Sequence, residues 1–142
     1  NHMAAEYTIT HDKGTTFKFY ALYKDSSGNA VDLSGQSARM QIRRSPDDTQ
    51  LALFVTTTGV TSGGTTGEFS GTGGAAGTGG ITLNGSSAGA AGTNGGIYVE
   101  FDAASSSFLP TGRMFYDFEL VNGEEVTRIV QGRFETISNI TR

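Results

Sequence analysis

The chain of 142 residues contains no cysteine. This absence excludes a disulfide framework and a cysteine-ligated metal site, and it leaves the redox compartment open. Histidine is scarce as well, because His2 lies in residues 1–3, which read as a cloning remnant, so that only His11 is left as a candidate for chemistry. A lone histidine beside Asp12 is more typical of a protein surface than of a catalytic dyad. We therefore expect no catalytic residue, no metal site and no cofactor.

Long hydrophobic runs and clusters of positive charge are also missing. No apolar run approaches the roughly 20 residues that a helix needs to cross a bilayer, and no signal peptide opens the chain. The 10 lysine and arginine residues are scattered, and the net charge is −4. A nucleic-acid-binding surface would gather basic residues on one face. We therefore expect neither a membrane nor a nucleic acid as a partner.

The clearest pattern that is present is a β-hairpin. Residues 113–121 alternate between the two faces of an extended strand, with the apolar face formed by Met114, Tyr116, Phe118 and Leu120. Asn122-Gly123 follows, a pair that favours a tight turn because both residues tolerate positive φ. A return strand then runs from residue 125 to residue 135.

Two registers compete for this hairpin: a strict two-residue turn, or a three-residue loop that includes one bulged residue. The bulged loop sets Leu120 opposite Val126 and Tyr116 opposite Val130. Because a slip of one residue moves every side chain to the other face, we predict the bulged loop. The Tyr116 hydroxyl either bonds back to residues 109–112, as in the tyrosine corner of immunoglobulin-like sandwiches, or lies at the edge of the core.

Other stretches show the same period of two. Ala38, Met40 and Ile42 alternate with polar residues, and one helical turn at most fits residues 103–108. The expected strands are 7–10, 15–24, 37–44, 51–57, 97–101, 113–121 and 125–135, and 81–83 could form an eighth. Seven or eight strands without long helices predict a single all-β domain, residues 4–142, built as an antiparallel β-sandwich of two sheets.

Between residues 58 and 96 the composition changes. These 39 positions hold 15 of the 21 glycines, and Glu68 is their only charged residue. Glycine loses the most backbone entropy on ordering, and the segment has little apolar surface to offset this loss. We expect a glycine-rich loop insertion, either a flexible surface excursion or an ordered loop packed on itself or on a neighbouring subunit. The candidate exposed-loop contacts are Phe69 and Tyr98.

Three local patterns imitate functional motifs. Residues 85–89 match G-x-S-x-G, but neither a helix nor a histidine follows, as a nucleophile elbow requires. Asp25, Asn29 and Asp32 could offer oxygen ligands to calcium, but these residue types are equally expected in turns. The third pattern is a pair of carboxylates on one strand face, Asp117 and Glu119. Its expected partners are the arginines of the return strand, Arg128 and Arg133, which favours ion pairs over an acid–base pair.

Several short segments, taken in order, resemble a known family. They are Lys13-Gly14-Thr15-Thr16-Phe17, residues 25–35 with Gly28 and Val31-Asp32-Leu33-Ser34-Gly35, residues 38–43, Leu109-Pro110-x-Gly112 leading to Tyr116-Asp117-x-Glu119-Leu120, and Val126-Thr127-Arg128 with Gly132. Their order and spacing are similar to those of small tailed-phage virion proteins whose fold is like the N-terminal domain of the baseplate upper protein. The resemblance covers about residues 6–57 and 97–142, and the glycine-rich insertion is far longer than the connection expected there.

The resemblance implies an immunoglobulin-like sandwich, no catalysis, and a structural or attachment role in a phage tail or baseplate. Such a protein would be made in the host cytoplasm and reside in the virion as one of several copies. Its partners would be other tail or baseplate proteins, or further copies of itself as a homo-oligomer. The candidate interface residues are apolar side chains on otherwise polar faces, namely Tyr20, Leu22 and Phe115.

A second function remains open from the sequence. A carbohydrate-binding or adhesive β-sandwich would recognise a host-surface glycan, and it would group exposed aromatic side chains on one face or in one cleft. Tyr20, Phe69 and Tyr98 are the candidates for such a group.

Overall fold

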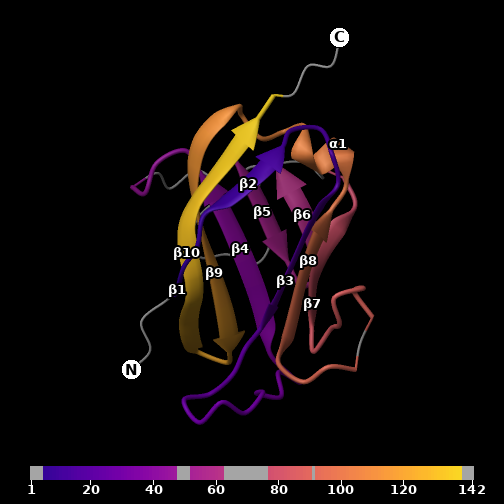
Figure 1. Cartoon of the computed structure of the whole chain (residues 1–142), viewed down its shortest axis with the longest axis vertical. Coiled ribbons are helices and arrows are strands. Elements are labelled where there is room, and N and C mark those ends of the chain that lie inside the picture. Colours follow the sequence, from indigo (N-terminus) through magenta and orange to yellow (C-terminus); the bar gives the residue numbers. More distant parts are fainter. Residues whose placement is uncertain (1–4, 48–51, 63–76, 91, 139–142) are drawn as a thin grey trace.

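The computed structural model describes residues 5–47, 52–62, 77–90 and 92–138 (Figure 1). Nearly all ordered elements in these ranges are strands. They are β1 Ala5–Glu6, β2 Ile9–Asp12, β3 Phe17–Leu22, β4 Ser37–Arg43, β5 Leu53–Thr56, β6 Gly59–Ser62, β7 Gly79–Leu83, β8 Gly96–Phe101, β9 Gly112–Asn122 and β10 Glu125–Ile137. The helix α1, Ala103–Ser106, lies within the range where the sequence predicts one helical turn. No helix in these ranges has the length and apolarity to cross a bilayer.

The strands form two layers. Sheet A has seven strands in the order β1-β10-β9-β4-β5-β6, with β2 also paired to β10, and sheet B has three strands in the order β3-β8-β7. Figure 1 shows β3 passing in front of the strands of sheet A, with β7 and β8 beside it. The all-β sandwich predicted from the sequence is confirmed, although the described ranges hold ten strands and not the seven or eight expected. One feature was not predicted: β1 and β2 run parallel to β10, whereas the other described pairings are antiparallel.

The core lies between the two sheets and follows the predicted alternation. On β4, Ala38, Met40 and Ile42 are buried, and Met40 pairs with the buried Phe118 of β9. Sheet B covers them with its own inward row, Phe17, Ile81, Ile97, Val99 and Phe101. Burial of such apolar side chains is the main favourable contribution to the stability of the sandwich.

A two-residue loop, Gly123-Glu124, closes the β9–β10 hairpin, and the predicted three-residue loop is wrong. Gly123 takes the first central position of the turn with a left-handed φ of 64°, which glycine adopts without steric cost. The register is therefore offset from the expected one, so that Leu120 pairs with Thr127 instead of Val126.

The bulge predicted at the turn lies instead inside β10, between Arg128 and Val130. Tyr116 consequently pairs with Gly132 and not with Val130. This register has a steric reason, because the N-terminal segment crosses β10 at this point. A Cβ at residue 132 would collide with the carbonyl oxygen of Tyr7, so only glycine fits opposite Tyr116.

The Tyr116 hydroxyl does not bond back to residues 109–112, as a tyrosine corner would require. It donates to the carbonyl oxygen of Tyr7 at 2.8 Å, across the sequence from one end of the domain to the other. Burial raises the pKa of this phenol, so that it remains a donor. The bond fixes the segment between β1 and β2 against β9, next to the parallel pairing with β10.

The glycine-rich tract is not a single loop in its described parts. β6 and β7 both lie within residues 58–96: β6 pairs with β5, and β7 pairs with β8. Ile81 supplies the apolar contact that holds β7, since it is buried in the core, and the strand expected at residues 81–83 is confirmed. Phe69 lies outside the described residues.

Candidate functional site

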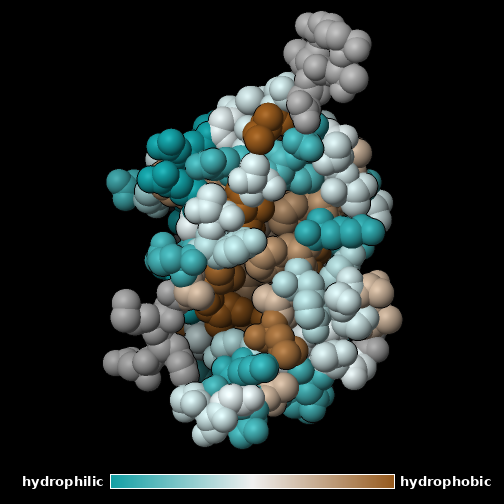
Figure 2. Space-filling view, in the orientation of Figure 1, coloured by the Kyte–Doolittle hydropathy of each residue, from teal (hydrophilic) through white to brown (hydrophobic). Residues whose placement is uncertain are grey.

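An apolar groove opens between the free edge of β3 and the β1–β10 edge of sheet A. It has a volume of about 560 Å³. Its apolar lining includes Tyr7, Phe19, Tyr20, Leu22, Ile129 and Val130. Figure 2 shows brown hydrophobic side chains in a hollow along the middle of this face, with polar residues on both sides. We call this surface the β3 groove.

Two of the side chains that line the groove are largely exposed. Tyr7 is 55% exposed and Leu22 is 42% exposed. Tyr7 contacts Phe19 across the groove, with ring centroids 5.8 Å apart. The β10 bulge at residues 128–130 also shapes the surface, because it places the consecutive residues Ile129 and Val130 along the same wall. Contiguous apolar surface rimmed by polar residues commonly marks an interaction site.

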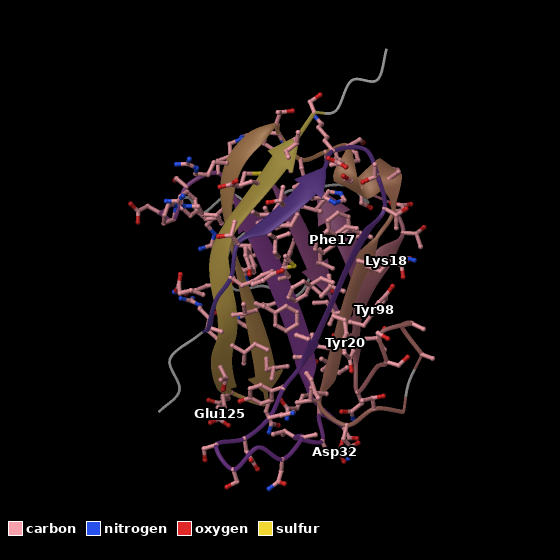
Figure 3. The ribbon with its side chains drawn as sticks, in the orientation of Figure 1. Phe17, Lys18, Tyr20, Asp32, Tyr98 and Glu125 are labelled. Carbon is pink, nitrogen blue, oxygen red and sulfur yellow. The ribbon has the colours of Figure 1, made fainter. Side chains whose placement is uncertain are left out.

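The backbone of β3 adds hydrogen-bonding groups to the groove. β3 pairs with β8 alone in the described sheet B, so one edge of β3 is free. The Tyr23 N–H donates to the Gly95 carbonyl at 2.7 Å. This bond identifies which residues of β3 direct their backbone N–H and C=O groups toward β8. Because backbone groups alternate along an antiparallel strand, those of Lys18, Tyr20 and Leu22 point away from β8. Figure 3 labels Lys18 and Tyr20 along this strand.

The structure brings two of the three predicted interface residues together. Tyr20 and Leu22 both line the β3 groove, whereas Phe115 lies on the outer face of sheet A. The prediction that Tyr98 is an exposed-loop contact is wrong, because its side chain is 5% exposed. The loop after β7 covers the ring: a Cβ added to Gly89 would lie 3.0 Å from the Tyr98 Cε2.

A second candidate surface lies on the outer face of sheet A, where polar side chains meet in three cross-strand rows over β4, β9 and β10. The rows are Arg39–Glu119–Arg128, Gln41–Asp117–Gln131 and Arg43–Phe115–Arg133. Glu119 accepts from Arg39 Nε at 2.8 Å and from Arg128 Nη2 at 3.0 Å. Of the two predicted arginine partners, Arg128 pairs with both carboxylates, whereas Arg133 forms no ion pair with either of them in the described part of the chain. Arg39 and Arg43 of β4 complete the network, and the sequence of the β9–β10 hairpin gives no indication of these two partners.

Asp117 has the most buried side chain among these charged residues. Its side chain is 8% exposed, and its Oδ2 lies 3.3 Å from Arg43 Nη2. Burial raises the pKa of the Asp117 carboxyl, against the opposing effect of the nearby Arg43 guanidinium. Asp117 Oδ1 and Arg43 Nε are both buried without a hydrogen-bond partner among the described residues.

His11 is buried, which corrects the expectation of a surface histidine. Its Nε2 lies 2.9 Å from Ser106 Oγ and 3.2 Å from the Thr15 carbonyl oxygen. The Ser106 Oγ also accepts a hydrogen bond from the Gly14 N–H, and Ser106 itself is fully buried. These hydrogen bonds connect three segments: β2, α1, and the turn that precedes β3. Burial lowers the pKa of His11.

The remaining sequence patterns resolve into turns. The Asp25 carboxylate accepts from the Ser27 and Asn29 N–H groups, and Gly85–Gly89 begins a loop and not a strand-to-helix elbow. Within the described ranges no group of three or more histidine, aspartate and glutamate side chains is placed to hold a metal ion.

Asn84 is a structural residue that the sequence reasoning missed. It holds a left-handed φ of 57°, and its Oδ1 accepts from the Leu33 N–H at 2.9 Å and the Gly95 N–H at 3.1 Å. Its Nδ2 donates to the Asp32 carboxylate at 2.8 Å. One side chain thus joins the loop after β7 to the turn before β4. The Asn84-Gly85 pair was a usable signal, since asparagine before glycine tolerates this backbone conformation.

A scan against protein-family models finds no match to this chain, and no curated protein sequence matches it.

Proposed function

We propose that this protein is a non-enzymatic structural module of a phage tail or baseplate, and that it joins its assembly by accepting an extended segment of a neighbouring virion protein in the β3 groove. One observation carries the binding mode: a free strand edge borders an exposed apolar groove. Addition of a strand to such an edge is a common mode of peptide recognition, in which the backbone supplies affinity and alternate side chains supply specificity. The virion setting rests on the sequence resemblance.

The groove favours one strand over the sheet edge of a second copy. Neighbouring strands lie about 4.8 Å apart, so an added strand would lie at this distance from the free edge of β3. β1 and β10 of sheet A continue along the other side of the groove. A second sandwich approaching β3 with its own sheet edge would meet these strands. The occupant is therefore a tail or an extended loop.

The side chains around the groove define the chemistry of this segment. Side chains of the segment that face the wall formed by Ile129 and Val130 must be apolar. Lys18 lies near the start of β3, and Lys24 lies just after its end and lines the groove. These two positive charges favour an acidic residue at each end of the partner strand. Lysine on an edge strand also discourages unselective pairing between edges.

A peptide titration tests the binding mode. The probe is a synthetic seven-residue peptide with valine at alternate positions and aspartate at both ends, added to ¹⁵N-labelled protein. We expect shifts and slower solvent exchange at the amides of Lys18, Tyr20 and Leu22. A control peptide with proline at alternate positions lacks the N–H donors and should not bind. Absence of protection at these amides would reject the β3 groove as a strand acceptor.

Two matched variants locate the site. Leu22→Glu places a charge in the groove, whereas Val126→Glu places it at another exposed apolar residue, near the β9–β10 turn. Leu22→Glu should lower peptide affinity at least about tenfold, equivalent to about 1.4 kcal/mol, and Val126→Glu should leave it unchanged. Equal effects would contradict the proposed location.

The virion assignment has its own test. Tagged protein is mixed with disassembled tail preparations, and bound components are identified by mass spectrometry. Retention of a tail or baseplate protein by the parent and by Val126→Glu, with loss in Leu22→Glu, is the expected result. If the peptide binds but no tail component does, the virion role fails while the strand-accepting groove stands.

A further inference from the structure

We propose that the outer face of sheet A holds a second, separate binding site, which takes one neutral sugar ring in a cavity beside Phe115, Arg43 and Asp117. The cavity has a volume of about 250 Å³. β1, β4, β9 and β10 all contribute to its wall, and Pro46 closes one side. It lies on the opposite face of sheet A from the core, so it shares no surface with the β3 groove.

The size of the cavity limits the ligand. Pockets that hold drug-sized molecules measure about 300–1,000 Å³, and this cavity is smaller. A single six-membered ring with its substituents is a ligand of suitable size. A longer saccharide would place one ring in the cavity and extend the others over the surface.

The charge of the wall favours a neutral ligand. Two guanidinium groups, those of Arg43 and Arg128, are balanced by two carboxylates, those of Asp117 and Glu6. An anion would gain from the arginines but would meet two negative groups, and a cation would meet the reverse. Hydroxyl groups suit such a wall because each can donate one hydrogen bond and accept others.

Two unpaired polar atoms point to the same chemistry. Asp117 Oδ1 is an acceptor without a donor, and Arg43 Nε is a donor without an acceptor, although both are buried. Leaving such groups unpaired is unfavourable, so a ligand that satisfies them gains affinity. Two neighbouring hydroxyls would supply one donor and one acceptor. Neither atom reaches solvent, so the Arg43 side chain must turn toward the cavity when the ligand enters.

Phe115 provides the apolar contact that sugar rings require. Its ring is half-buried and lines the cavity in the same cross-strand row as Arg43. The face of a pyranose carries C–H groups, and an aromatic ring with its negative π face packs well against them. Phe115 thus places an aromatic ring between two arginines in its row, where it can pack against a bound sugar.

A monosaccharide titration tests the proposal. The neutral probes are glucose, galactose, mannose and N-acetylglucosamine, and the anionic probes are glucuronate and N-acetylneuraminate, each added to ¹⁵N-labelled protein. At least one neutral sugar should shift the amides of Phe115, Asp117 and Gln131, with a dissociation constant of about 10 mM or tighter. The proposal is overturned if no neutral sugar shifts these amides, or if an anionic sugar binds more tightly than every neutral one.

Matched variants separate the site from general aromatic effects. Phe115→Leu keeps an apolar side chain but removes the ring, and Phe108→Leu makes the same change at an exposed phenylalanine just after α1. The first should weaken sugar binding at least about fivefold, or about 1 kcal/mol, and the second should not change it. Asp117→Asn keeps the shape but alters the polar pairing and should also weaken binding. Equal affinities for the two leucine variants would reject the site.

Discussion

The hydroxyl of Tyr116 donates a hydrogen bond of 2.8 Å to the backbone carbonyl of Tyr7. The two residues lie more than a hundred positions apart in the chain, and the bond joins β9 to the segment between β1 and β2. Beside it, the Tyr7 N–H donates to the Gln131 carbonyl at 3.0 Å. Together these bonds hold the N-terminal segment across sheet A, where it forms part of the wall of the β3 groove.

Removal of this hydroxyl should loosen the N-terminal segment. Tyr116→Phe leaves the Tyr7 carbonyl without its side-chain donor, and we expect a loss of about 1 kcal/mol in the free energy of unfolding. Tyr7→Phe removes a hydroxyl from an exposed ring and serves as the control. Urea denaturation measures the stabilities, and amide exchange at Tyr7 reports the local effect. Equal exchange rates in Tyr116→Phe and the parent would contradict this role.

Substitution at Gly132 should be more damaging than at Gly112, a glycine of positive φ that faces open space. A Cβ at residue 132 meets the Tyr7 carbonyl oxygen, whereas one at Gly112, with a φ of 122°, meets open space. Gly112→Ala should cost about 1–2 kcal/mol from backbone strain alone. Gly132→Ala adds a steric clash and should exceed it by at least about 1 kcal/mol in the free energy of unfolding. Similar losses for the two variants would show that the crossing of the N-terminal segment is not tight.

The burial of His11 predicts a dependence of stability on pH. Its pKa in the folded protein lies below the usual 6.5, so between these two values the unfolded chain binds more protons than the folded one. The free energy of unfolding should therefore be highest above about pH 6.5 and decline as the pH falls below that value. Urea titrations between pH 7.5 and 5 measure the slope.

The His11→Asn variant isolates this contribution. In this variant the part of the slope that is due to the imidazole should vanish, because asparagine does not titrate. An NMR titration of the His11 ring in the parent supplies a direct reading. A midpoint at or above 6.5 would contradict the effect of burial.

Asn84 should prove important for the loop that covers Tyr98. Asn84→Gly keeps the left-handed backbone accessible but removes the side-chain bonds to Leu33, Gly95 and Asp32, and it should cost about 2 kcal/mol. Asn84→Ala should cost about 1 kcal/mol more, because a Cβ is strained at a φ of 57°. Thermal and urea denaturation compare the two variants. An alanine variant as stable as the glycine variant would show that the loop relaxes at this position.

Most of the sandwich could be predicted because its strands carry a local signal. The alternation around Met40 and Phe118 identifies two central strands and their inward faces without any knowledge of the fold. β1 and β6 gave no such signal. β1 is two exposed residues long, and the strand character of β6 depends on its pairing with β5.

The register of the hairpin could not be predicted, for a reason that is not local. The turn sequence and the apolar pattern of β10 fit more than one pairing, and the choice is settled by the fit of Gly132 beneath Tyr7. The same holds for His11, whose burial depends on α1 and on the rings of Phe101 and Phe134, far away in sequence. Contacts between segments that are distant in the chain produce no periodic pattern in the sequence around either residue.

The candidate site was predicted in part. Tyr20 and Leu22 were found because they are apolar on the outward face of a strand, which local alternation reveals. Ile129 was not found, because it reaches the groove through a bulge that interrupts the alternation. Tyr98 was misplaced because the backbone that shields it comes from Gly89, a residue that shows no apolar pattern.

The parallel pairing of β2 with β10 determines how the domain would respond to tension. β1, β2 and β10 all run in the same direction, and they lie next to one another in Figure 1. A force that pulls the termini apart acts along these strands and loads the hydrogen bonds between them simultaneously. In an antiparallel terminal pair, the hydrogen bonds between the strands would instead break one after another. The domain thus has the geometry of a mechanical clamp, which would resist stretching when it is anchored at both ends.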